Sequence, residues 1–259
     1  EGQLAHEHAE LRRMQAGRRH LGGPAAERGQ ALAGVVPDAA PARALGEAVE
    51  TAIKLARRWG YEKRGIADGQ AEIIVCHNNF HGRTTTIVSF SSDPLYRDGF
   101  GPFTPGFVSV PFGDLDALAA AITPRTCAFL VEPIQAEAGV LMPPDGYLAA
   151  AAQLCRDRGV LLLADEIQTG LGRTGYLLAC EHERVRPDVA ILGKALSGGV
   201  YPVSAVLSSS AVMSVFHPGS HGSAAPATIV PRAWRRVMLC GESFMVRISP
   251  RHGSMSNCG

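Results

Sequence analysis

The sequence predicts an α/β domain of three layers, α/β/α, around a mostly parallel sheet. Short apolar runs, at 160–164 and 189–192, end abruptly in turn or ionisable residues, as strands buried on both faces do. Stretches with helical periodicity alternate with such runs, in the βαβ order that produces parallel sheets. The chain has 259 residues, which is enough for one large domain or two small ones.

Composition excludes several classes of protein. The formal net charge of +1 argues against a nucleic-acid-binding or polybasic membrane-binding role. No apolar run approaches the roughly 20 residues of a membrane-spanning helix. The six cysteines contain no C-x-x-C pair, which argues against a zinc site or a disulfide scaffold and favours the cytoplasm. We therefore expect no metal, nucleic-acid or membrane partner.

Periodicity and turn residues predict alternating helices and strands in the middle of the chain. We expect helices over 47–59, 114–122 and 146–158, and strands over 72–76, 127–131, 160–164, 189–192 and 201–207. Gly60 and Gly159 are expected to end helices, Asp114 to cap one, and Asn79 to cap a helix after the first strand. The last strand should return to the sheet edge. The Pro- and Gly-rich stretch 93–111 is interpreted as a long functional loop.

The two ends of the chain differ from the middle. Residues 1–44 are rich in Ala, Arg, Gly and Pro and lack aromatic residues, and residues 224–259 show no strand–helix alternation. We expect 1–44 to be a divergent, poorly ordered segment, 45–223 to be a partial ligand-binding domain, and 224–259 to be a divergent tail with little regular structure.

Ionisable residues follow several predicted strands, at the edge where open α/β sheets bind ligands. Lys194 is either a solvated lysine or one that forms a Schiff base with a cofactor. Asp165 either caps a turn or keeps the nitrogen of a pyridine ring protonated, as pyridoxal phosphate (PLP) chemistry needs. Gln168, three residues further on, is placed to bind the phenolic oxygen of such a ring.

A second group of candidates follows the strands over 72–76 and 127–131. Phe80 is either a core residue or a platform for the cofactor ring, and Arg83 is suited to hold a carboxylate by a bidentate fork. Glu132 and Glu137 are expected at the same edge. The sequence G-L-G-R-T-G at 170–175 matches a dinucleotide-binding pattern, but it begins four residues after the strand-ending acids, so we dismiss it.

Several motifs together resemble a known family. From about Gly46 to Ser223 the chain is similar to the central part of the large domain of class III (fold type I) PLP-dependent aminotransferases. The motifs are E-A-V-E-T-A-I-K-L-A-R from 47, N-F-H-G-R-T from 79, G-F-G-P-F from 99, V-E-P-I-Q from 131, D-E-I-Q-T-G-L-G-R-T-G from 165 and G-K-A-L-S-G-G-V-Y-P-V-S-A-V from 193. The last motif favours the ornithine aminotransferases of the family over the acetylornithine and 4-aminobutyrate types.

The resemblance implies a cofactor, PLP, and roles for residues. Lys194 would bind PLP covalently and shuttle protons, with Asp165 and Gln168 as ring contacts, Phe80 stacked on the ring and Gly46 near the phosphate. Substrate contacts would come from Arg83, His81, Glu132 and Glu137, of which Arg83 would hold the oxo acid and Glu137 would discriminate ornithine from glutamate. The implied reaction moves the δ-amino group of L-ornithine to 2-oxoglutarate. It implies a homodimer, in the cytoplasm or, for an animal protein, the mitochondrial matrix.

The chain also departs from the family pattern. Ala44-Leu45-Gly46 supplies only half of the usual phosphate cup, and the motif that begins at His221 is abandoned at Ala224. Ala136 replaces a usual glycine, and the family's C-terminal domain has no counterpart. These departures favour an alternative in which the chain is a truncated, catalytically impaired remnant. Accordingly, we expect weak or absent transaminase activity from the chain as written.

Overall fold

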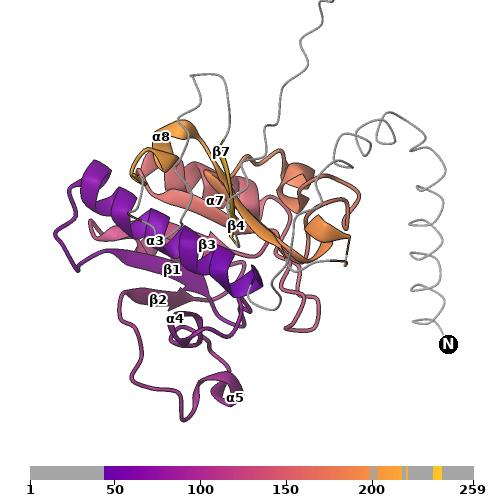
Figure 1. Ribbon diagram of the computed structural model, residues 1–259, viewed down its shortest axis with the longest axis horizontal. Coiled ribbons are helices and arrows are strands. Elements are labelled where there is room, and N and C mark those ends of the chain that lie inside the picture. The colour runs from indigo at the N-terminus through magenta and orange to yellow at the C-terminus, as the bar shows by residue number, and fades with distance from the viewer. Residues whose placement is uncertain (1–43, 199, 201–202, 218–219, 221–235, 241–259) are drawn as a thin grey trace, which may run out of the picture. The chain divides into compact units, whose positions relative to one another are not determined.

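The computed structural model describes residues 44–198, 200, 203–217, 220 and 236–240 (Figure 1). Within them, seven strands form one sheet in the order β2-β1-β3-β4-β5-β6-β7. The strands are β1 (Glu72–Cys76), β2 (Phe107–Val110), β3 (Thr126–Val131), β4 (Leu161–Asp165), β5 (Val189–Leu192), β6 (Ser204–Ser208) and β7 (Arg236–Cys240). The pairings from β2 to β5 are parallel, and β6 and β7 are antiparallel. The predicted mostly parallel sheet is confirmed.

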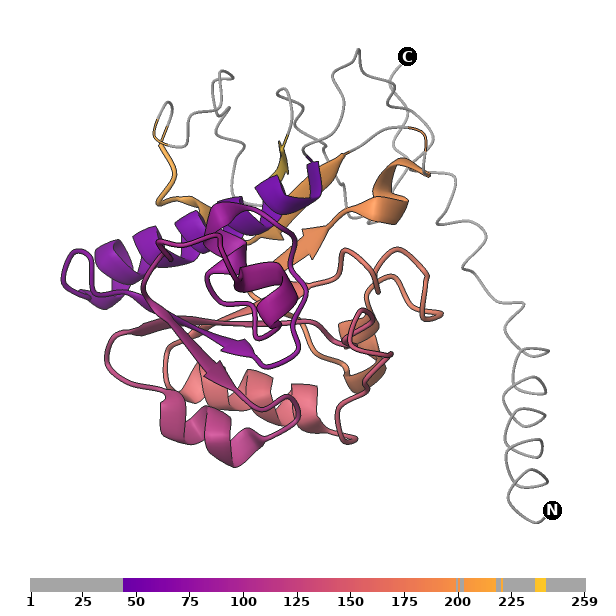
Figure 2. The same ribbon diagram turned by 90° about the horizontal axis from the view of Figure 1, so that it is seen from below.

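Helices cover both faces of this sheet. They are α3 (Ala44–Arg64), α4 (Thr85–Val88), α5 (Pro94–Arg97), α6 (Leu115–Ala121), α7 (Tyr147–Asp157) and α8 (Ser210–Met213), with 3₁₀ turns η3 (Ala179–Glu183) and η4 (Lys194–Ser197). The long helix α3 lies on one face, and α6 and α7 lie on the other (Figure 2). The domain therefore has the three expected layers.

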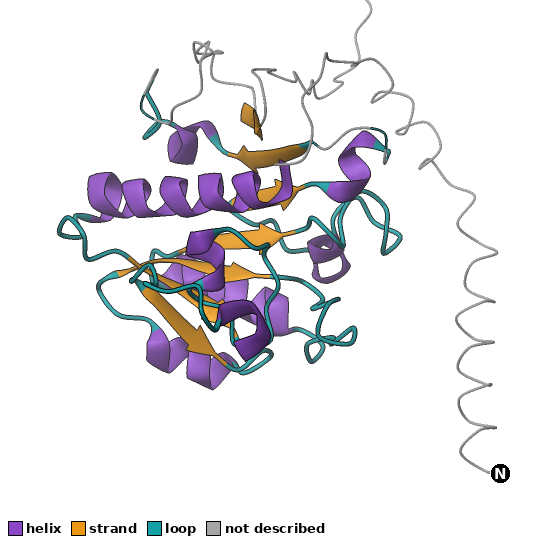
Figure 3. Cartoon of the chain, turned by 60° about the horizontal axis from the view of Figure 1, so that its bottom comes forward, coloured by secondary structure: helices purple, strands orange, loops and turns teal. Residues whose placement is uncertain are grey.

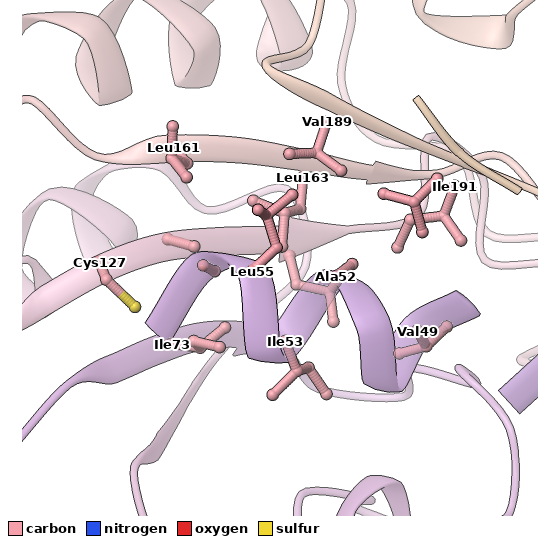
Figure 4. Close-up of a cluster of buried hydrophobic side chains, with 14 of the residues drawn as sticks. Val49, Ala52, Ile53, Leu55, Ile73, Cys127, Leu161, Leu163, Val189 and Ile191 are labelled. Carbon is pink, nitrogen blue, oxygen red and sulfur yellow. The ribbon is translucent and has the colours of Figure 1, made fainter. Parts of the chain in front are cut away.

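Alternating strand side chains build a separate core on each face. Ile73 of β1 and Leu163 of β4 point towards α3, whereas their neighbours Ile74 and Leu162 point towards α6 and α7. Figure 4 shows the first core, in which Val49, Ala52, Ile53 and Leu55 of α3 meet the strands. Because both faces are covered, the central strands are apolar except at their ends, which is the pattern visible in the sequence.

The first helix is longer than expected, and the prediction that Gly60 ends it is wrong. The helix continues to Arg64. A Cβ at Gly60 would lie 2.7 Å from Cβ of Cys127 on β3, so the glycine allows the helix to approach the sheet closely. The other helix signals are confirmed: the Asp114 side chain accepts from the Ala117 N–H at the start of α6, and Gly159, with φ of 60°, follows α7.

Two further local predictions are corrected. The supposed loop over 93–111 contains α5 and the edge strand β2, which pairs with β1 from Ile73 opposite Phe107. Asn79 does not cap a helix: its Nδ2 donates to the carbonyl oxygens of Cys76 and Phe90, at 2.6 and 3.3 Å, while Thr84 caps α4.

The end of the sheet also differs from the expectation. The last predicted strand is present as β6, but β7 pairs with it from Ser204 opposite Cys240, so β6 is not the edge. The expected lack of regular structure after residue 223 is therefore wrong for Arg236–Cys240. Residues 1–43, and the rest of the tail, lie outside the described residues. Over the described ranges, no helix is long and apolar enough to cross a membrane.

Candidate active site

The loops that follow the parallel strands carry the predicted site residues, and they meet at one edge of the sheet (Figure 3). Two sets of contacts join residues that follow or end four strands. His81, after β1, contacts Asp165 at the end of β4; Gln168 contacts Lys194 after β5; and Lys194 approaches Glu137 after β3. Sheet topology thus brings together residues that lie up to 113 positions apart, from His81 to Lys194.

Asp165 is a buried acid held from two sides. Its Oδ2 lies 2.7 Å from Nδ1 of His81, and its Oδ1 accepts from the Ile167 N–H at 3.1 Å. An ionised carboxylate can only accept, so Nδ1 of His81 carries the hydrogen. Asp165 is 4% exposed and His81 3% exposed, so His81 contacts the acid from inside the protein. A substrate contact for His81 stays a prediction.

His81 combines opposing influences on its protonation. Burial disfavours the imidazolium, but the hydrogen bond that His81 donates to Asp165 and the charges of Glu132 and Asp165 outweigh it, so the pKa of His81 is raised. Its Nε2 has no hydrogen-bond partner among the described residues, although it is buried.

Lys194 follows β5 in a strained conformation. Its φ is 40°, which is uncommon for a residue other than glycine and typical of functional positions. Its Nζ donates to Oε1 of Gln168 at 2.6 Å and lies 3.9 Å from Oε1 of Glu137. The lysine side chain is 41% exposed, so the amine is tethered yet accessible.

The two glutamates that follow β3 have different surroundings. Glu137 is half-exposed beside Lys194, whereas Glu132 is 4% exposed and its Oε2 accepts from the Phe80 N–H at 3.1 Å. Burial raises the pKa of Glu132 to about 7; His81 opposes this, and the charges of Asp165 and Glu137 reinforce it. Glu132 therefore fixes the backbone of the loop after β1.

Arg83 lies with two aromatic rings. Its Cζ is 4.8 Å from the centre of the Tyr96 ring and 5.8 Å from that of Phe80, and the two rings meet edge to face at 5.7 Å. Cation–π contacts of this kind hold a guanidinium in place without consuming its hydrogen-bond donors. Arg83 is exposed, so its fork remains available to an anion.

The first turns of α3 pack against the same loop. A Cβ on Gly46 would come 2.9 Å from Cγ2 of Thr84, and the Thr84 hydroxyl hydrogen-bonds the Glu50 carboxylate. Glycine at this position thus lets the helix start close to Arg83. The helix places the positive end of its dipole at this edge of the sheet.

Two positioning residues were not predicted individually. Glu166 is 1% exposed and accepts from Thr169 Oγ1, Ala179 N and Cys180 N at 2.5, 3.0 and 2.9 Å, which ties down the segment that carries Gln168. Gln135 donates through Nε2 to the His77 carbonyl oxygen at 2.8 Å. The sequence signals were the motifs V-E-P-I-Q from 131 and D-E-I-Q-T-G-L-G-R-T-G from 165, which contain Gln135 and Glu166 shortly after the strand ends.

Comparison with known proteins decides the family. The model of the aminotransferase class-III family matches residues 35–227, which is most of the chain. The chain belongs to this family. It is 64% identical over 183 residues to the ornithine aminotransferase of Bordetella pertussis, an alignment that covers 71% of this chain and 44% of the relative.

Solved structures agree with this placement. An ornithine aminotransferase of Toxoplasma gondii, described with PLP at partial occupancy in its active site, superposes with a TM-score of 0.69 at 50% identity, over 70% of this chain and 43% of the other. An acetylornithine aminotransferase of Elizabethkingia anophelis superposes with a TM-score of 0.60 at 57% identity, over 70% and 44%. The chain spans less than half the length of the relatives it matches.

The site residues fit PLP, the cofactor of this class of enzyme. Gln168 Nε2 is buried without a hydrogen-bond partner among the described residues, so one donor remains for a ligand oxygen. Asp165 offers an anion for a ring nitrogen, and Lys194 offers a primary amine. Within the described residues, no cluster of three metal-binding side chains offers a competing interpretation.

Proposed function

We propose that the chain carries the cofactor-binding part of an aminotransferase that moves the δ-amino group of L-ornithine to 2-oxoglutarate, giving glutamate 5-semialdehyde and glutamate. The observation that carries the proposal is the contact of Lys194 with Gln168, three residues after the buried Asp165 that ends β4. The identity to curated ornithine aminotransferases supports the choice of substrate.

PLP, when bound, supplies an electron-withdrawing ring that makes the α-proton of an attached amine acidic. The chain's own residues provide the rest. Asp165 holds the proton on a ring nitrogen, and Gln168 Nε2 donates to a ring oxygen. Lys194 Nζ accepts and returns the proton at the reacting carbon. Phe80 covers the ring, and Arg83 binds a carboxylate of the oxo acid through its free fork.

Glu137 is the proposed specificity residue, because an exposed carboxylate beside Lys194 attracts the second amino group of a diamine. The resemblance to an acetylornithine aminotransferase supports a second candidate substrate, N-acetylornithine, in which that amino group is acylated and uncharged.

We further propose that the protein forms a homodimer and is located in the cytoplasm. Light scattering of the purified chain tests the first of these.

The deciding experiment combines a spectrum with an assay. The purified chain is mixed with PLP and scanned for a visible absorbance band that Lys194→Ala abolishes. Ornithine or N-acetylornithine is then supplied with 2-oxoglutarate, and the aldehyde product is followed. A band without turnover supports the cofactor site alone, and the absence of any band refutes the proposal. A preference for N-acetylornithine over ornithine would identify N-acetylornithine as the substrate.

A further inference from the structure

A buried carboxylate in the site has no role in the scheme above. Glu132 is 4% exposed, and its Oε2 holds the Phe80 N–H at 3.1 Å. Glu137, five residues further along the same loop, is 46% exposed in its side chain and faces Lys194. The two glutamates of this loop therefore differ in burial, and Glu132 already holds a backbone N–H.

The charges around Glu132 come from three elements. His81 on the loop after β1 lowers the pKa of Glu132 by its charge, and Asp165 at the end of β4 and Glu137 on the same loop raise it. His81 and Asp165 contact each other at 2.7 Å and are both buried. When His81 is protonated, this pair carries no net charge. Glu132 then decides whether the cluster is neutral or carries one negative charge.

We propose that Glu132 is the charge-balancing carboxylate of the site, which loses its proton when a cationic ring binds beside Asp165. The inference rests on the proposed cofactor function. A protonated ring adds one positive charge to a buried cluster, and an uncompensated buried charge is costly. An ionised Glu132 supplies the missing negative charge without moving, since its position is already fixed by the Phe80 N–H.

The proposal predicts a proton balance. Burial raises the pKa of Glu132 to about 7, so about half of the free protein carries the proton at pH 7. A cation nearby lowers the pKa of a carboxyl group by about one to three units. Binding of the ring should therefore release about half a proton per site from Glu132 at pH 7.

The test uses the full chain and pyridoxamine 5′-phosphate, which has the ring and the phosphate but no aldehyde to react with Lys194. Titration calorimetry in two buffers of different ionisation enthalpy measures the protons released. The wild type should release about half a proton more than Glu132→Gln at pH 7, because protons exchanged by the ligand itself cancel in the difference. Glu132→Gln keeps an oxygen for the Phe80 N–H, and the surface variant Glu62→Gln should behave as the wild type.

Affinity provides a second readout. Glu132→Gln should bind the ligand about tenfold more weakly or worse above pH 8, and the gap should shrink steadily as the pH falls below 7, because the wild-type carboxyl of the free protein is then protonated. If Glu132→Gln does not fold, the wild type is compared with an analogue whose ring is benzene instead of pyridine. The wild type should then release about half a proton more with the pyridine ligand than with the benzene analogue.

The outcomes separate the two proposals. Binding with equal proton release in the wild type and Glu132→Gln, or in the wild type with both rings, overturns the role of Glu132 and leaves the cofactor site standing. No binding of pyridoxamine 5′-phosphate by the wild type overturns the cofactor site and this inference with it.

Discussion

Glu166 offers the sharpest test of how the site is held in place. Its carboxylate is buried, and three neutral donors satisfy it: Thr169 Oγ1 and Ala179 N on Oε2, and Cys180 N on Oε1. Glu166→Gln keeps the size of the side chain but leaves only one acceptor oxygen. If that oxygen keeps the two donors of Oε2, the new NH₂ group faces the Cys180 N–H.

The cost follows from this count. A buried N–H without an acceptor costs about 1–3 kcal/mol, and two hydrogen bonds lose the assistance of a charge, for about 1 kcal/mol more. We expect the free energy of unfolding to fall by about 2–4 kcal/mol. For a domain of this size, that lowers the melting temperature by roughly 4–16 °C.

Urea denaturation followed by circular dichroism measures this change, with Glu183→Gln as the matched control. Glu183 also accepts two backbone N–H groups, from Gly146 and Ala149, but it is only partly buried, so about 1 kcal/mol is expected. A loss below about 1 kcal/mol in Glu166→Gln, or an equal loss in both variants, would refute the reasoning that burial makes the Glu166 network strong.

Three other predictions follow from the geometry. Gly60→Val should lower the free energy of unfolding by about 1–3 kcal/mol in urea titrations, because its Cβ would meet Cys127 at 2.7 Å; an unchanged midpoint would show that α3 moves freely. Arg83→Lys should raise KM for 2-oxoglutarate about tenfold or more while KM for ornithine stays within twofold, since lysine lacks the bidentate fork; equal changes in both would contradict its role. As the pH rises from 5 to 7, the wild type should lose roughly 2 kcal/mol of stability from Glu132, whose folded pKa of about 7 exceeds the unfolded value of 4.5. The folded state then binds more protons than the unfolded state, so raising the pH destabilises it, and Glu132→Gln should flatten the curve in urea titrations across this range.

The sequence predicted the parts of the fold that depend on local pattern. Strands covered on both faces, such as β3 and β4, are continuous apolar runs, and their ends were placed within one residue. The edge strand β2 was missed because it is covered less completely and lies in a stretch rich in Pro and Gly. Gly60 was misjudged because its reason is contact with Cys127, which lies 67 positions away.

The candidate site also has parts that the local sequence pattern predicts and parts that depend on distant packing. That Lys194 and Asp165 lie at the same edge could be predicted, because each follows a parallel strand. The difference in burial between Glu132 and Glu137 could not be predicted, since the two lie five residues apart after the same strand. Only the packing of the loop after β1 buries the first, through the Phe80 N–H, and leaves the second exposed beside Lys194.

The reversal of strand direction after β5 explains why Lys194 stands where it does. β6 runs antiparallel, with Ala205 opposite Leu192, so the chain leaves and re-enters the sheet at the same edge within residues 193–204. A parallel continuation would have carried the chain to the opposite edge through a crossover helix. The return instead keeps a short segment, which begins with η4, at the site edge. Lys194 therefore occupies the first position of η4, directly after β5, with a φ of 40°, and its amine meets Gln168 there.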